Sequence, residues 1–196
     1  GDKAESLKAG SYLLPEGASM AEITEIITKG GASTCGTEVV YRIGVTASNV
    51  QVRELDPATG KYVETAEFSP GSETPAAFTK ARSDAGTRFR VAVAEGVTSW
   101  QVIEGLKSVD VLDGASGDIP AEGTLAPDSY EVRVGDTRAS VLARMTEAQS
   151  VLLASAWEGR ASGLPLASPE EALILASIIE KETGVAEERG QVASVF

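Results

Sequence analysis

The chain has 196 residues, of which 42% are hydrophobic, so it can close a real core as one ordinary domain or two small ones and is not a disordered chain. Its 29 acidic residues against 17 basic ones give a net charge of −12, the wrong sign for neutralising phosphates, and we expect no nucleic-acid partner. The single Cys35 and the absence of histidine exclude an intramolecular disulfide, a thiolate zinc cluster and every nucleophile–histidine triad. We therefore expect no metal or cofactor, and chemistry that rests on carboxylates, hydroxyls or lysines.

The two ends of the chain carry no targeting pattern. No run of 18 apolar residues occurs, and the opening GDKAESLKAG lacks the charged start and apolar core of a signal peptide. Because the chain opens on Gly1 and stops at ASVF inside a helix-like stretch, we expect it to be a fragment excised from a longer protein.

The first predicted helix covers residues 20–29, and a β-rich segment follows it. Ser19 and Glu22 have the spacing of a capping box, in which each side chain bonds a free backbone N–H at the helix start. Residues 37–68 contain three β-branched and aromatic runs, TEVVYRIGV, VQVREL and KYVETAEF, separated by turn formers, which predicts strands. Residues 69–86 are rich in Pro, Gly, Ser and Thr and predict a long loop.

The second half of the chain changes to helical periodicity after the strand RFRVAVA. Capping boxes at Thr98/Gln101 and Ser168/Glu171 predict helices over 99–107 and 169–183. Apolar residues recur every 3.6 positions between 137 and 158, where Gly159 predicts a left-handed stop. The change from period 2 to period 3.6 predicts an α+β fold with a helical piece from about residue 136 onward.

A strand, turn and capped helix recur along the chain. GSYLLPEGASMAEITEII at 10–27 aligns with FRVAVAEGVTSWQVIEGL at 89–106 at an offset of 79 residues, and we interpret the pair as a common module. DSYEVRVGDTRASVLARM at 128–145 is a weaker third copy. For this copy, a chance resemblance between strand–turn–helix units is an equally good explanation.

The predicted helix 169–183 contains one carboxylate on its apolar stripe. At 100° per residue, Glu182 lies only about 20° from Leu175, whereas Glu180 points about 140° away. We therefore expect Leu175, Ile178 and Ile179 to be buried, Lys181 to be exposed, and Glu182 to be less accessible than Glu180. Burial would raise the pKa of Glu182 and suit it to general acid catalysis. Alternatively, the core ends at Ile179 and both glutamates lie on a solvated last turn.

Four segments resemble a known family. LASIIEKETGVAEERGQVASVF at 175–196 is similar to the signature of the YceG-like family of endolytic murein transglycosylases. EGTLAPDSYEV at 122–132 resembles the family's EG-x-L-x-PDTY motif, SAWEGRASGLP at 155–165 also fits, and RVAVAEGVTSWQVIEGL resembles the LysM-like module that precedes the catalytic region. Together these stretches cover about a third of the chain.

The resemblance implies a reaction and a site. It implies cleavage of peptidoglycan glycan strands between N-acetylmuramic acid and N-acetylglucosamine without water, leaving a 1,6-anhydro end, with the second glutamate of the E-K-E-T run, Glu182, as the catalytic residue. Glu122, Tyr130, Glu180 and Glu188 are weaker candidates for substrate binding, each with an alternative role as a helix cap, a core residue or a surface charge. The implied partners are glycan strands and cell-wall synthesis proteins, at the periplasmic face of a bacterial inner membrane that is reached only through an anchor outside this chain.

The resemblance also implies a domain organisation. Residues 1–35 and 87–117 would form the LysM-like module, 36–86 a β-rich insert into it, and 118–196 the N-terminal part of a catalytic domain. Because the family's catalytic domain continues further, we expect this fragment to be inactive by itself. Two other interpretations remain: a non-catalytic LysM-like module that binds peptidoglycan, and an acidic scaffold whose repeats only mediate protein contacts.

Overall fold

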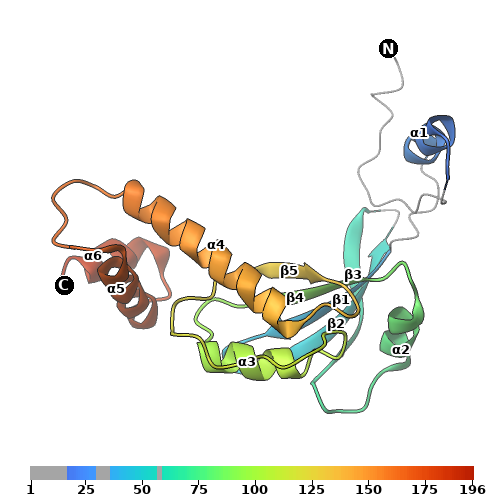
Figure 1. Cartoon of the computed structure of the whole chain (residues 1–196), viewed down its shortest axis with the longest axis horizontal. Coiled ribbons are helices and arrows are strands. Elements are labelled where there is room, and N and C mark those ends of the chain that lie inside the picture. The colour runs from blue at the N-terminus through green and yellow to red at the C-terminus, as the bar shows by residue number, and fades with distance from the viewer. Residues whose placement is uncertain (1–16, 30–35, 57–58) are drawn as a thin grey trace. The chain divides into compact units, whose positions relative to one another are not determined.

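The computed structural model describes residues 17–29, 36–56 and 59–196 (Figure 1). It contains a five-stranded sheet and six α-helices among the described residues, which confirms the predicted α+β class. In chain order the elements are α1 (Met20–Lys29), β1 (Thr37–Ile43), β2 (Asn49–Asp56), β3 (Lys61–Phe68), α2 (Ala76–Ser83), β4 (Arg88–Val93), α3 (Ser99–Lys107), β5 (Ser129–Val132), α4 (Arg138–Glu158), α5 (Pro169–Glu182), the short 3₁₀ helix η1 (Ala186–Glu188) and α6 (Arg189–Ala193).

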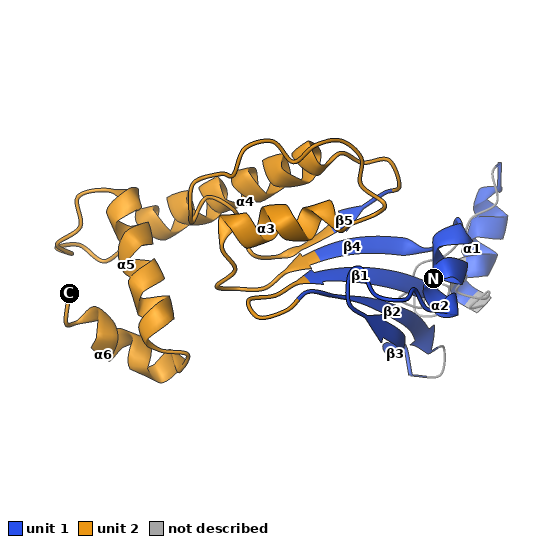
Figure 2. Ribbon diagram, turned by 90° about the horizontal axis from the view of Figure 1, so that it is seen from below, with its two compact units in different colours: residues 1–42, 48–91, 131–133 blue, residues 43–47, 92–130, 134–196 orange. Residues whose placement is uncertain are grey.

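The five strands form one sheet in the order β3-β2-β1-β4-β5, and the chain divides into two compact units (Figure 2). Unit 1 comprises residues 1–42, 48–91 and 131–133, and unit 2 comprises residues 43–47, 92–130 and 134–196. The division into a LysM-like module, an insert and a catalytic part stays a prediction. Cys35 and residues 10–16 of the first repeat copy lie outside the described residues.

Unit 1 contains the antiparallel meander β1-β2-β3, so the strands predicted within residues 37–68 are confirmed. Successive residues Val39, Val40 and Tyr41 are all buried, as expected of a strand that is covered on both faces. β3 has no buried residue, and the β2–β3 register shifts at Val52/Arg53, which marks a bulge.

A buried carboxylate on β1 is paired across the meander of unit 1. The side chain of Glu38 is only 4% exposed and accepts a hydrogen bond of 2.7 Å from Arg53 Nη2 on β2. Arg90 Nη1 lies 3.8 Å from the other carboxylate oxygen. A charge taken out of water is tolerated when opposite charges lie against it, so these arginines account for the burial of Glu38.

Helix α2 corrects the prediction of a long loop over residues 69–86. It begins after Pro75 with no side-chain cap bond, so the signal that marks α1, α3, α4 and α5 is missing from its sequence. Instead, Phe78 and Ala81 are buried, and the Phe78 ring packs edge-on against Tyr41 and Phe68 at centroid distances of 6.4 and 5.1 Å. Tertiary packing, which no local pattern reveals, holds this helix.

The starts of α1, α3 and α5 are those predicted from capping, and α4 begins after Thr137, where the apolar periodicity predicts a helix. The reciprocal bonds of a capping box are present at Ser19/Glu22 and at Thr98/Gln101. At the start of α5, Ser168 accepts from Glu171 N, but the Glu171 carboxylate bonds Ala167 N, one residue before the cap. The predicted left-handed stop is wrong, because Gly159 has φ −80° and ψ 0°.

The repeat is visible in the backbone of all three copies. Gly17, Gly96 and Gly135 have φ values of +80°, +78° and +92°, and each is followed two residues later by a cap residue and then a helix. The third copy follows the second by 39 residues, from Thr98 to Thr137, and each of these two copies places a strand before the glycine. An L-residue rarely adopts such φ values, so a shared glycine at this turn favours a common unit over a chance match.

Unit 2 has a core between α3, the segment after it and the first half of α4. Leu106, Val109, Val141 and Met145 are fully buried. The guanidinium of Arg138, at the first residue of α4, donates to the carbonyl oxygens of Leu106, Lys107, Val109 and Gly114. Leu106 and Lys107 are in the last turn of α3, so one side chain joins the end of α3 to the start of α4.

Candidate functional site

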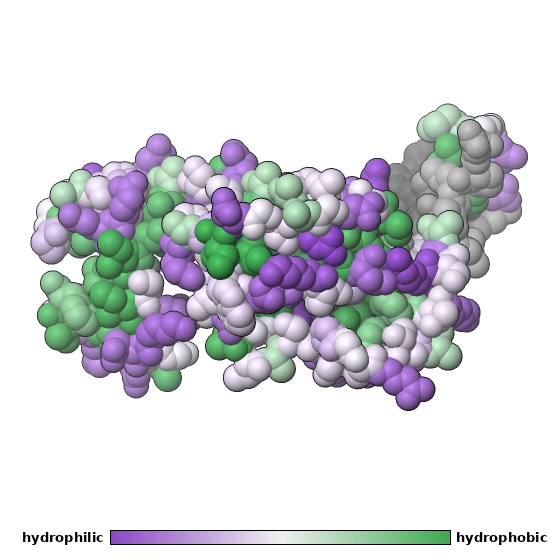
Figure 3. Space-filling model, turned by 60° about the horizontal axis from the view of Figure 1, so that its bottom comes forward, coloured by the Kyte–Doolittle hydropathy of each residue, from purple (hydrophilic) through white to green (hydrophobic). Residues whose placement is uncertain are grey.

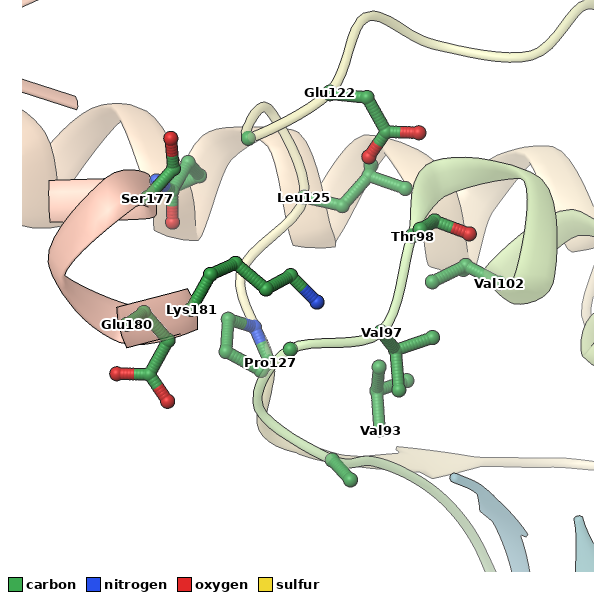
Figure 4. A pocket seen from close by; sticks show the side chains of 14 residues that line it. Val93, Val97, Thr98, Val102, Glu122, Leu125, Pro127, Ser177, Glu180 and Lys181 are labelled. Carbon is green, nitrogen blue, oxygen red and sulfur yellow. The ribbon is translucent and has the colours of Figure 1, made fainter. Parts of the chain in front are cut away.

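A cavity of about 470 Å³ lies in unit 2, within the range typical of small-molecule sites (Figure 4). It is formed by the end of β4 with the turn after it, the start of α3 and the loop 122–127. Helix α4 contributes one residue, Gln149, and α5 contributes one face. Its apolar wall comes from valine, leucine and proline side chains of the first three segments: Val93, Val97, Val102, Leu125 and Pro127.

Two glycine turns shape this cavity. Gly96 lies in the turn between β4 and the cap Thr98, and both residues line the cavity. Gly123 has φ +78°, and a Cβ added there would lie 3.0 Å from Leu173 Cδ2 of α5. The EG-x-L segment can therefore pack closely against α5 only because it has glycine at this position.

Glu122 joins the loop of the cavity to the start of α3. Its carboxylate accepts a hydrogen bond of 3.0 Å from Ser99 N, and Ser99 Oγ donates to Ala121 O at 3.1 Å. A carboxylate at a helix N-terminus is stabilised by the free N–H groups and the helix dipole. Glu122 thus lines the cavity while also serving the structural role of capping α3.

Helix α5 contributes Ser177, Glu180 and Lys181 to the cavity, a spacing of three and four residues that places them on one face. In Figure 4 the Lys181 ammonium points into the cavity, whereas the Glu180 carboxylate points away from it. Glu180 instead lies 3.5 Å from Arg189 Nη2.

Glu182 does not line this cavity. It is the last residue of α5, about 100° around the helix from Lys181, and it is exposed to solvent. The expected burial of this part of α5 is wrong: Leu175, Ile178 and Ile179 are only half-buried, and both Glu180 and Glu182 are exposed. The expected exposure of Lys181 is confirmed. The helical periodicity correctly predicted which residues of α5 share a face. However, nothing in the described structure of unit 2 covers that face fully.

The two remaining candidates have structural partners away from the cavity. Tyr130 is 9% exposed, its hydroxyl donates to Ala126 O at 2.8 Å, and burial raises the pKa of this phenol. Glu188 accepts a hydrogen bond of 2.9 Å from Thr183 Oγ1, just beyond the end of α5. The structure therefore brings only Glu122 and Glu180 of the five sequence candidates to the cavity.

Three cavity residues escaped the sequence analysis: Gln149, Ser177 and Lys181. Ser177 and Lys181 are four residues apart, so a polar stripe on the helix was readable. The prediction of a site on this helix from its periodicity rested only on the apolar stripe, and Lys181 was expected to be a surface charge.

Comparison with known proteins places the chain in one family. The sequence model of the YceG-like family matches residues 1–196. The chain belongs to the YceG-like family. Membership is consistent with a transglycosylase-type function on peptidoglycan in general terms. No curated protein matches the chain significantly.

The part of the chain that the structure describes contains neither a metal-ligand cluster nor a membrane-spanning helix. Among residues 17–29, 36–56 and 59–196, no three His, Cys, Asp or Glu side chains are grouped so that they could hold a metal ion. In the same ranges, no helix has the length and apolarity needed to span a bilayer.

Proposed function

We propose that the protein is an endolytic peptidoglycan lytic transglycosylase, with the activity implied by the resemblance to MltG, a member of this family. The observation that carries the proposal is the family match over residues 1–196. It is supported by the position of the E-K-E-T run at the end of α5, a helix whose neighbouring face lines the cavity of unit 2. We further propose glycan strands and cell-wall synthesis proteins as partners, at the periplasmic face of the inner membrane.

One carboxylic acid suffices for this reaction. Glu182, the residue we propose as catalytic, would give its proton to the glycosidic oxygen while the bond between that oxygen and C1 of N-acetylmuramic acid breaks. The C6 hydroxyl of the same sugar then attacks C1 and returns its proton to the carboxylate. The products are a free hydroxyl on N-acetylglucosamine and a 1,6-anhydro end, and no water is consumed.

The proposal predicts a large effect of one substitution. Glu182→Gln keeps the size of the side chain but cannot transfer the proton, so release of anhydro-ended fragments should fall by about 10²–10⁴-fold. Purified sacculi digested with the full-length protein, with products separated by chromatography and mass spectrometry, provide the measurement. Glu180→Gln is the matched control on the same helical turn and should reduce the release of anhydro-ended fragments far less.

A second function has one observation in its favour. Glu182 is exposed and lies outside the cavity, as expected if the chain only binds glycan and this carboxylate has no chemical role. Near-normal product release by the Glu182→Gln protein would contradict the catalytic assignment. If neither the parent protein nor the variant released anhydro ends but both bound sacculi, the binding function would replace the enzymatic one.

A further inference from the structure

The cavity of unit 2 contains an unbalanced positive charge. Of the described residues that line it, Lys181 is the only one with a basic side chain. Its ammonium points into the cavity in Figure 4, and no hydrogen bond or ion pair is formed by it with the described part of the chain. An ammonium group offers three donors and no acceptor, so its preferred ligand is an anion.

The two acidic residues of the lining do not satisfy this charge. Glu180 is directed away from the cavity and lies beside Arg189 at 3.5 Å. Glu122 is bonded to the N-terminus of α3 through Ser99 N and forms no ion pair with Lys181 within 4.0 Å. The cavity thus combines an apolar wall with one cation that can receive a ligand.

We propose that Lys181 binds a carboxylate of the muramyl unit in this cavity, and so distinguishes peptidoglycan from neutral glycans. This inference rests on the proposed function. N-acetylmuramic acid carries a lactyl ether that ends in a carboxylate when no peptide is attached, and the attached peptide carries carboxylates of its own. The apolar wall of Val93, Val97 and Leu125 suits the methyl and ring carbons beside such a group. Lys181 is thereby a substrate-binding and specificity residue, separate from proton transfer.

The test compares three ligands by calorimetry with the full-length protein. They are peptide-free glycan strands with lactyl carboxylates, glycan strands that retain their peptides, and chitotetraose, which has no carboxylate. Lys181→Met should weaken binding of a carboxylate-bearing strand by about tenfold and leave chitotetraose unchanged. Lys181→Arg should retain the preference because it keeps the charge. If Lys181→Met weakens binding of the peptide-free strand, the bound group is the lactyl carboxylate. If it weakens binding of the strand that retains its peptides, the bound group is a peptide carboxylate.

Lys107→Met is the matched control, since Lys107 also lies in the last turn of a helix, α3, but pairs with Glu104 and does not line the cavity. It should bind all three ligands as the parent protein does. Equal losses for charged and neutral ligands in Lys181→Met, or no loss at all, would overturn the inference. If the parent protein binds chitotetraose and both strands equally, only the inference fails. If it binds none of them, the proposed function fails as well.

Discussion

Helices α3 and α5 begin in the same way and end up in different surroundings. Both start with a hydroxyl cap that accepts a backbone N–H, at Thr98 and Ser168. α3 nevertheless buries five of its nine residues, whereas α5 buries none of its fourteen. Apolar side chains remain on the surface of the C-terminal helices (Figure 3, left), where Ile174 is 61% exposed. A cap determines where a helix starts, and only the neighbouring elements determine whether its apolar face is buried.

The largest expected difference is in the free energy of unfolding when one apolar side chain of α3 or of α5 is truncated. Leu106 of α3 is fully buried, so Leu106→Ala should lower the free energy of unfolding by about 2–5 kcal/mol through lost contacts and a cavity. Ile174→Ala in α5 should change it by about 0.5 kcal/mol or less, because that side chain is in water. Urea denaturation followed by circular dichroism measures both. Equal costs would mean that α5 is as well packed as α3.

A glycine pair sharpens the same comparison. A Cβ added at Gly105 of α3 would lie 2.6 Å from Ile43 Cδ1, so Gly105→Ala should destabilise the protein by about 1–3 kcal/mol through overpacking. A Cβ added at Gly190 of α6 meets nothing within 4 Å. Gly190→Ala should therefore stabilise that short helix by up to about 1 kcal/mol, because alanine is the better helix former. Thermal denaturation of the two variants distinguishes these opposite signs.

The smallest effect is a pH dependence of the first turn of α5, which is compared with the cap residue of α3. Bonds from its own backbone N–H and from Ser168 lower the pKa of Glu170, in the first turn of α5. A lowered pKa means that this stabilisation is complete above about pH 4.3, the ordinary value, and is lost as the pH falls through the lowered one. The capping box of α3 uses Gln101, which does not titrate.

Amide chemical shifts followed by NMR between pH 6 and 2.5 test this difference. The backbone amide of Glu170 in α5 should shift more with pH than that of Thr98 in α3, which is bonded to the Gln101 side-chain amide, and Glu170→Gln should reduce the shift in the first turn of α5. A first turn of α5 that is unaffected by pH in the parent protein would contradict the assignment of these bonds.

Local chemistry made the helix starts predictable, because a cap residue and its partner lie three positions apart in the sequence. The strands were predictable for a similar reason, since β-branched runs between turn formers need no distant partner to be recognised. Helix α2 was missed because the packing of Phe78 replaces a cap. The burial predicted for α5 was wrong for a similar reason. The apolar periodicity shows which residues share a face of the helix, but not whether another element packs against that face.

The site was predictable only where a sequence motif names the residue. Glu122 and Glu180 were proposed from the resemblance and do line the cavity, whereas Glu182 does not. The spacing of Ser177 and Lys181 was readable, but the sequence could not show that their face of α5 lines a cavity. The cavity is assembled from segments up to 88 residues apart in sequence, from Val93 to Lys181. The catalytic role of Glu182 stays a prediction.

The residue directly after the cap shows how duplicated units lose their equivalence. That position holds Met20, Ser99 and Arg138 in the three copies. Ser99 is bonded to the loop at 121–122, while Arg138 holds the carbonyls at the end of α3. The three copies keep the turn glycine and a hydroxyl cap, Ser19, Thr98 or Thr137, whereas the next residue attaches the second and third copies to different segments of unit 2. Divergence at this one position would therefore make the copies alike in backbone and no longer exchangeable.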